Sequence, residues 1–227
     1  MNTARLFSLS GICLILGGAA RALFWLLVVP FATFAGAATA LNSLEQFAQV
    51  FNVLGAALVI YGFLGLYAAH HRQMRTFGLV GFALALLGGM GVLADALIGL
   101  VIFPSMATAA PATIEPDGAF FVGNILGLYV AIFAINMIGQ FSFGFALWKY
   151  TSLPRVALGL FLASAILANL PPLPVLHYVL IAGGVAGGTG IVWLGWALRS
   201  LAFRAVPERG YLRREDSGIF GPRDANS

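Results

Sequence analysis

The chain consists mainly of long apolar segments separated by short breaks, which restricts it to a small set of architectures. The hydrocarbon core of a bilayer is about 30 Å thick, so a helix needs about 20 apolar residues to cross it. Six segments reach or approach this length: residues 6–29, 50–69, 77–103, 120–148, 156–170 and 175–198. The sequence therefore predicts an all-α, polytopic membrane protein, with a six-transmembrane-helix domain over residues 1–204.

The balance of residue types also favours lipid surroundings. The chain is 60% hydrophobic and only 9% charged, whereas a soluble domain is about 25% charged. The basic residues form no stripe interleaved with aromatic residues, so nucleic acid is not an expected partner. Cys13 is the one cysteine, which excludes an intramolecular disulfide and a cysteine-based metal site. The expected surroundings are the lipid bilayer and possible partner subunits within it.

The positions of the basic residues predict the orientation. Of the 12 Lys and Arg residues, all except Arg21 lie before the first segment, after the sixth, or in the connections after the second and fourth. The other connections carry only the acidic residues Glu45, Glu115 and Asp117. Basic residues are retained in the cytoplasm, so we expect both termini there, in a plasma membrane. Residues 205–227, rich in charge, glycine and proline, are expected to form a disordered cytoplasmic tail.

A partial repeat suggests how the segments pair. The residues Arg, Phe, Leu, Gly, Leu and Leu recur with the same spacing from Arg5 and from Arg75. Arg155 and Gly159 keep only the start of this pattern. The repeat favours three helical hairpins, although Leu and Gly are common enough in this chain for chance similarity to be the alternative. It also favours retention of the first segment, which otherwise suits a cleavable signal peptide.

One short stretch resembles a known family. A predicted helix ends in the aromatic and basic residues Trp148-Lys149-Tyr150. The turn Leu153-Pro154-Arg155 follows, and a new helix begins around Leu158-Gly159. This stretch resembles the later half of an uncharacterised bacterial multi-pass family, one of the domains of unknown function. The resemblance implies a bacterial inner-membrane protein with this topology, and it implies no activity.

Three ionisable residues lie within the apolar segments, where charge is costly and usually paired or functional. At 1.5 Å per residue, Arg21, Asp95 and His177 lie about 24, 30 and 33 Å from the cytoplasmic end of their helices. Arg21 and Asp95 could form a structural ion pair, Arg21 could extend to the outer interface beside Trp25, or Arg21 could bind a polar or anionic group. His177 is interpreted as interfacial, with ligand binding as the alternative.

Amide side chains in the same half of the membrane extend this hypothesis. Asn136 and Gln140 share one helix face, and Asn52 and Asn169 lie in neighbouring segments. Such amides commonly bond between helices for packing alone. Alternatively, Asn136 and Asn169 could join Arg21, Asp95 and His177 in a binding site that opens outward.

No catalytic or cofactor motif is present. The glycine-rich run 183–190 lacks the Lys-Ser/Thr of a phosphate-binding loop and suits close helix packing instead. No pair of buried carboxylates and no nucleophile motif is found, so an enzyme is not predicted and no particular cofactor is indicated. The expected function is that of a membrane-embedded binding or interaction protein: a sensor, assembly factor or accessory subunit. The alternative is a small transporter or carrier of an apolar or amphiphilic compound.

Overall fold

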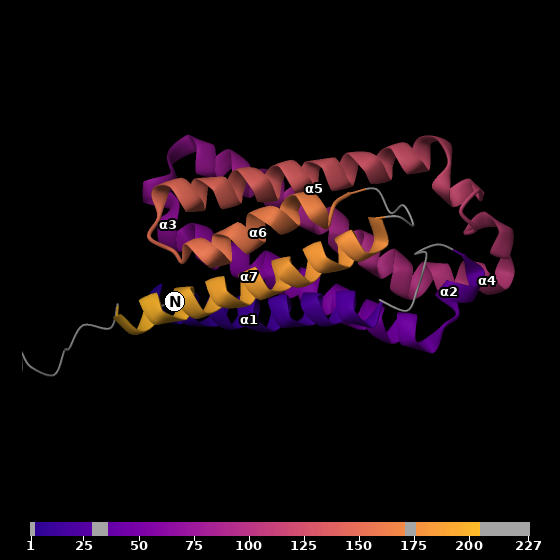
Figure 1. The fold of residues 1–227 in the computed structure, drawn as a ribbon, viewed down its shortest axis with the longest axis horizontal. Coiled ribbons are helices and arrows are strands. Elements are labelled where there is room, and N and C mark those ends of the chain that lie inside the picture. The colour runs from indigo at the N-terminus through magenta and orange to yellow at the C-terminus, as the bar shows by residue number, and fades with distance from the viewer. Residues whose placement is uncertain (1–2, 29–35, 171–175, 205–227) are drawn as a thin grey trace, which may run out of the picture.

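The computed structural model describes residues 3–28, 36–170 and 176–204, and in these ranges all regular elements are helices. Figure 1 shows their arrangement. The elements are α1 (Thr3–Leu27), α2 (Ala37–Ala40), α3 (Ser43–Leu97), the π-helical η1 (Ile98–Ile102), α4 (Phe103–Ala109), the short 3-10 turns η2 (Pro111–Thr113) and η3 (Ala119–Phe121), α5 (Gly123–Tyr150), α6 (Arg155–Leu167) and α7 (His177–Arg204).

Four stretches of helix in the described residues are long and apolar enough to cross a membrane: Ala4–Leu27, Ser43–Ala109, Gly123–Tyr150 and His177–Leu201. The second is a 67-residue stretch, far longer than one crossing requires. The apolar α6 has 13 residues and is shorter than a full span. The chain is thus an all-helical protein of membrane type. The predicted tail and the proline-rich break at 171–174 lie outside the described residues.

The long helix α3 turns back on itself at Arg75. This residue has non-helical dihedral angles, with φ 53° and ψ −157°, a region that non-glycine residues rarely adopt. Beyond this bend, the second half of α3 runs antiparallel to the first half and packs against it. The stacked rings of Tyr67 and Phe82, with centroids 4.2 Å apart, show this contact. Gln49 likewise lies beside Gly99. The predicted break at 70–76 is therefore a reversal centred on one residue, as Figure 1 shows.

The predicted segment 77–103 ends just before Pro104, but this proline does not end the helix. The π-helical turn η1 precedes it, and Pro104 lies in the first turn of α4, where its missing N–H is tolerated. Carbonyl groups around the proline accept hydrogen bonds from nearby hydroxyls. Ser105 Oγ donates to Val101 O at 3.0 Å, and Thr108 Oγ1 donates to Ser105 O at 2.9 Å. The helix continues past the proline to Ala109.

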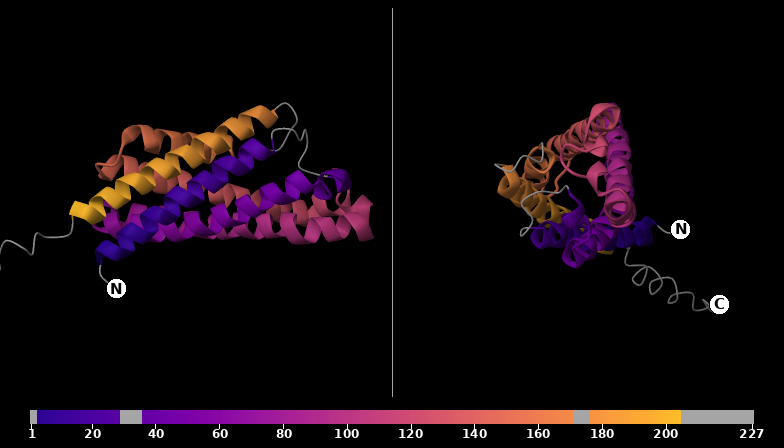
Figure 2. Two further views of the ribbon diagram at one scale, coloured as in Figure 1. Left: turned by 90° about the horizontal axis from the view of Figure 1, so that it is seen from below. Right: turned by 90° about the vertical axis from the view of Figure 1, so that its right-hand side faces the viewer.

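The helices pack around a closed circuit of neighbours. Helix α1 contacts the first half of α3 and, on its other side, α7; α5 contacts the second half of α3 and α6; and α6 contacts α7. The left-hand view in Figure 2 shows α1 and α7 running side by side. Glycines permit the closest approaches: a Cβ at Gly188 would lie 2.6 Å from the Gly18 carbonyl oxygen, and one at Gly195 would lie 2.7 Å from the Gly11 carbonyl oxygen. Small residues therefore set the spacing of α1 and α7.

The interior and the exterior of the bundle are both apolar. Four phenylalanines fill the interior: the ring of Phe63 lies 5.5 Å from Phe143 and 5.6 Å from Phe161, and Phe82 lies 5.6 Å from Phe143. We call this group the phenylalanine cluster. Outward-facing residues are also large and apolar; Val101, for example, is 60% exposed. An exterior of this kind suits lipid.

The two ends of the bundle differ in charge. One end, which we call the basic end, contains the start of α1 at Arg5, the bend at Arg75, the connection between Lys149 and Arg155, and Arg199 near the end of α7. This end lies on the left in Figure 1. At the opposite end, Glu115 accepts a hydrogen bond from the backbone N–H of Ala37 at 3.1 Å. This bond ties the segment before α3 to the segment before α5.

Candidate functional site: an internal polar network

A chain of side-chain hydrogen bonds runs from the first turns of α3 to α1. Gln49 Nε2 donates to Glu45 Oε1 at 2.8 Å, and Asn52 Nδ2 donates to Gln49 Oε1 at 3.1 Å. Arg21 Nη1 then donates to Asn52 Oδ1 at 2.9 Å. The three α3 residues are spaced four and three apart and therefore share one face of the helix. Glu45 and Asn52 are buried, so the network extends from the acidic end of the bundle into its interior.

A glycine on α3 makes room for Arg21. A Cβ at Gly55 would lie 2.8 Å from Arg21 Cγ, so the arginine stem lies directly against the α3 backbone. This position directs the guanidinium toward Asn52, one turn away along α3. Arg21 therefore reaches an amide of the neighbouring helix.

Asp95 comes from the second half of α3 and lies beside Tyr129 of α5. The charges of Asp95 and Arg21 are near enough to interact. The hydrogen bond that the structure gives Arg21 goes to Asn52, not to Asp95. Arg21 and Asp95 therefore interact through their charges. Each also lies beside an uncharged polar side chain: Asn52 for Arg21 and Tyr129 for Asp95.

A second group of amides joins α5 to α6. Asn136 is only 2% exposed, and its Nδ2 donates to Asn169 Oδ1 at 2.9 Å. Gln140 Nε2 donates to Asn136 Oδ1 at 2.9 Å, and Asn169 Nδ2 donates to Ala165 O at 2.9 Å. The sequence hypothesis placed Asn136 and Asn169 together, and the structure brings them into direct contact.

A small cavity of about 50 Å³ lies between the two polar groups. It is lined by polar groups from three helices, together with small and apolar residues. The polar lining residues are Arg21, Asn136, Gln140 and Ser164. A buried water occupies about 30 Å³, so the cavity has room for one or two groups of that size. Phe63 also lines the cavity, and the phenylalanine cluster separates it from the basic end.

The other predicted site residues lie around this cavity or apart from it. Asp95 and Asn169 are linked to lining residues but are not in the lining themselves. His177 begins α7, is 5% exposed and packs against the Tyr178 ring, and it does not line the cavity. The site thus brings together Arg21, Asp95, Asn136 and Asn169, and leaves His177 outside.

Three residues of the site were not identified from the sequence. Gln49 extends the polar face of Asn52 toward Glu45, and its spacing could have indicated this. Ser164 enters the cavity opposite Gly187, but a single serine in an apolar helix carries no such signal. Tyr129 approaches Asp95 from α5. Only the packing of α5 against α3 reveals this proximity.

The described residues contain no group of three or more His, Cys, Asp or Glu side chains that could hold a metal ion. No family model matches the chain, and neither a curated protein nor a solved structure shows significant similarity to it. The fold and the site themselves define the class: an all-helical protein of membrane type with a polar network enclosed among its helices.

Proposed function

We propose that the chain crosses the membrane six times as three hairpins, with both termini in the cytoplasm of a bacterial cell. The reversal of α3 at Arg75 supports two crossings by that helix. The antiparallel contacts of α1 with α3, of α3 with α5, and of α6 with α7 support the hairpins. The collection of basic residues at one end supports the orientation, and the resemblance around Leu153-Pro154-Arg155 supports a bacterial inner membrane.

We propose further that the protein is a membrane-embedded binding protein and not an enzyme. The observation that carries this proposal is the cavity beside Arg21, where a guanidinium, two amides and a hydroxyl meet inside an apolar bundle. Polar groups in a membrane interior are costly unless they are paired or functional. Within the described part of the chain, Arg21 has one hydrogen-bond acceptor, Asn52, for its five N–H donors. A small polar group, such as a carboxylate, could accept some of the others.

The shape of the interior supports entry from the outer side. The hydrogen-bonded chain from Glu45 to Arg21 provides polar surroundings on that side of the cavity. On the other side, Phe63 contacts both Phe143 and Phe161, and all three rings belong to the apolar core. A site that is polar on one side and closed on the other suits binding, as in a sensor or an accessory subunit. It does not suit a continuous channel.

The phenylalanine cluster also favours one alternative. In a carrier, a site must open alternately to each side of the membrane. The cluster would then be the inner gate, and it would have to separate during each cycle. A small transporter or carrier is therefore the second candidate function.

Thiol accessibility distinguishes the two functions without knowledge of the ligand. With Cys13→Ser as background, Ser164→Cys places a thiol in the cavity, and the matched control Thr189→Cys places one on the exposed face of α7. Silver ions are small enough to enter, and loss of free thiol is measured after denaturation. A binding protein predicts reaction at Ser164→Cys from the outer side only. Reaction from both sides would favour a carrier, and protection from both sides would contradict either function.

A further inference from the structure

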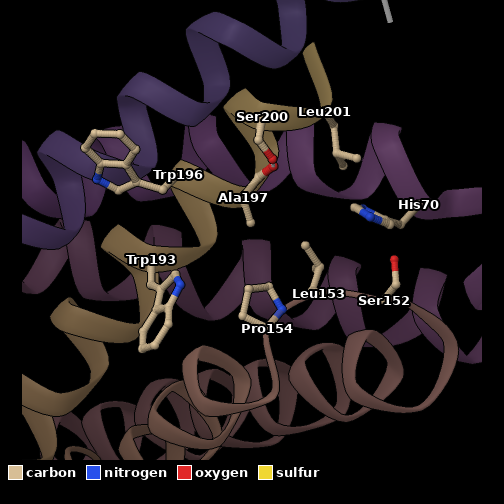
Figure 3. A pocket seen from close by; sticks show the side chains of 9 residues that line it. All are labelled: His70, Ser152, Leu153, Pro154, Trp193, Trp196, Ala197, Ser200 and Leu201. Atoms are coloured by element: carbon tan, nitrogen blue, oxygen red, sulfur yellow. Dashed lines mark hydrogen bonds between the residues drawn. The ribbon is translucent and has the colours of Figure 1, made fainter. Parts of the chain in front are cut away.

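A second, larger cavity lies at the basic end of the bundle and is distinct from the internal polar network. It has a volume of about 290 Å³. Its walls come from α3, from the connection between α5 and α6, and from the last turns of α7. Figure 3 shows its side chains, which include His70, Ser152, Pro154, Trp193, Trp196 and Ser200. Among the described residues, none lines both cavities.

The polar groups of this cavity are suited to accept hydrogen bonds. His70 Nδ1 lies 3.1 Å from the carbonyl oxygen of Leu66. A carbonyl can only accept, so Nδ1 carries the proton and Nε2 of the neutral ring is left as an acceptor. Ser200 Oγ donates its hydrogen to Ala197 O at 2.7 Å, which leaves the oxygen lone pairs available. Ser152 supplies another hydroxyl, from the connection between α5 and α6.

The remaining lining favours a positively charged ligand. Two indole rings, Trp193 and Trp196, come from α7 and are 44% and 61% exposed. In Figure 3, Trp193 projects toward Pro154, and Trp196 lies on the other side of the α7 ribbon. Tryptophan faces attract ammonium groups, and tryptophans gather at membrane interfaces. Among the described residues, no Lys, Arg, Asp or Glu lines the cavity. Hydrogen-bond acceptors and indole rings without a basic side chain fit an ammonium group better than a phosphate.

Two basic residues are sequence neighbours of lining residues but do not line the cavity themselves. Arg155 follows the lining residue Pro154 in the chain, and its guanidinium lies 5.4 Å from the Trp148 ring centroid. Arg199 precedes the lining residue Ser200, and its stem lies against Gly11 of α1. A ligand with an ammonium group inside the cavity and a phosphate outside it would match both features. At the membrane interface, aminophospholipids combine these two groups.

We propose that this cavity binds the head group of an aminophospholipid, with its ammonium group directed toward His70 and Ser200. The proposal rests on the membrane topology proposed above, but not on ligand binding beside Arg21. The two sites are separate, so a failed accessibility test at Ser164 would leave this proposal intact.

Lipid binding to the purified full-length chain tests the proposal. Native mass spectrometry would compare the binding of phosphatidylethanolamine, phosphatidylglycerol and phosphatidylcholine in the same detergent. Free phosphoethanolamine, which carries the same ammonium and phosphate groups without acyl chains, is tested alongside them. We expect phosphatidylethanolamine to bind about fivefold more tightly than either of the other lipids, as expected for one net hydrogen bond. The trimethylammonium of phosphatidylcholine cannot donate hydrogen bonds. Equal binding of the three lipids, or equally tight binding of phosphoethanolamine alone, would overturn a lipid site.

A pair of exposed positions on α7 provides the variant and its control. Ser200→Phe fills the cavity, whereas Thr189→Phe adds the same side chain at an exposed hydroxyl position outside the lining. We expect Ser200→Phe to lose the preference for phosphatidylethanolamine and Thr189→Phe to retain it, with similar melting temperatures. Retention of the preference in Ser200→Phe would contradict the assignment of the site. If Ser200→Phe does not fold, Ser152→Phe in the connection between α5 and α6 tests the same cavity.

Discussion

At the scale of single residues, the main feature is an arginine enclosed among apolar helices. Arg21 lies against Gly55, donates to Asn52 at 2.9 Å and faces the charge of Asp95. Two opposite charges in one low-dielectric interior stabilise each other only while both are present. The sequence identified the two charges, and the structure adds the amide and the glycine that hold Arg21 in place.

A double-mutant cycle measures how strongly these charges are coupled. We expect Arg21→Met and Asp95→Leu each to lower stability in detergent by about 3–5 kcal/mol, because each leaves one buried charge uncompensated. The double variant should recover much of the loss, as measured by thermal unfolding. Leu16→Met, at an exposed position on α1, is the control and should melt like the parent. Losses that simply add would show that Arg21 and Asp95 are independent.

At the scale of elements, α7 shows how a glycine-rich run fits two neighbouring helices. A Cβ at Gly183 would lie 2.6 Å from Leu167 Cβ of α6, whereas one at Gly188 would lie 2.6 Å from the Gly18 carbonyl oxygen of α1. Gly187 faces Ser164 of α6. Consecutive glycines thus alternate between partners, as their rotation about the helix axis requires. The packing interpretation of the run 183–190 accounts for these contacts without a bound phosphate.

Replacing one of these glycines should force the helices apart. A Cβ at Gly187 would lie 2.6 Å from Ser164 Cβ, so Gly187→Leu should destabilise the bundle by about 1–3 kcal/mol through overpacking. Thr189→Leu introduces the same side chain at an exposed position two residues away and should have little effect. Thermal unfolding of both variants in detergent is the measurement. Equal melting temperatures would mean that α7 does not pack against α6 at Gly187.

At the scale of the whole molecule, charge and apolar surface together determine how the bundle sits in a membrane. The basic end carries Arg75, Lys149, Arg155 and Arg199, and the opposite end carries Glu45 and the bond from Ala37 to Glu115. The exterior between the ends is apolar. This distribution supports the proposed orientation, in which the basic end faces the cytoplasm.

Labelling of single cysteines from each side of the membrane tests that orientation. In the Cys13→Ser background, His71→Cys near the α3 bend and Ser152→Cys between α5 and α6 should react with an impermeant reagent only from the cytoplasm, because basic connections are retained there. Asp117→Cys should react only from outside. Reaction of Asp117→Cys from the cytoplasm would reverse the assignment. Opposite outcomes at His71→Cys and Ser152→Cys would rule out paired hairpins.

The sequence alone was sufficient for properties that depend on local composition. Segment length and hydropathy predicted an all-helical protein of membrane type, and the four long apolar helices agree with this. The positions of Arg5, Arg75 and Arg155 also indicated which connections share one end. These properties add up along the chain, because each residue contributes its own hydropathy or charge wherever its neighbours lie.

Only the tertiary structure determined which side chains meet. Helices that are apolar on all sides carry no stripe that specifies their rotation about their own axes. The sequence therefore could not show that Arg21 contacts Asn52, that Ser164 joins the cavity, or that His70 lines a second one. Glycine contacts decide those rotations, because two helices approach closely only where their small residues coincide. The sequence by itself determined that the protein is built from apolar helices and which of their connections carry basic residues. The packing of the helices decided where the polar sites lie.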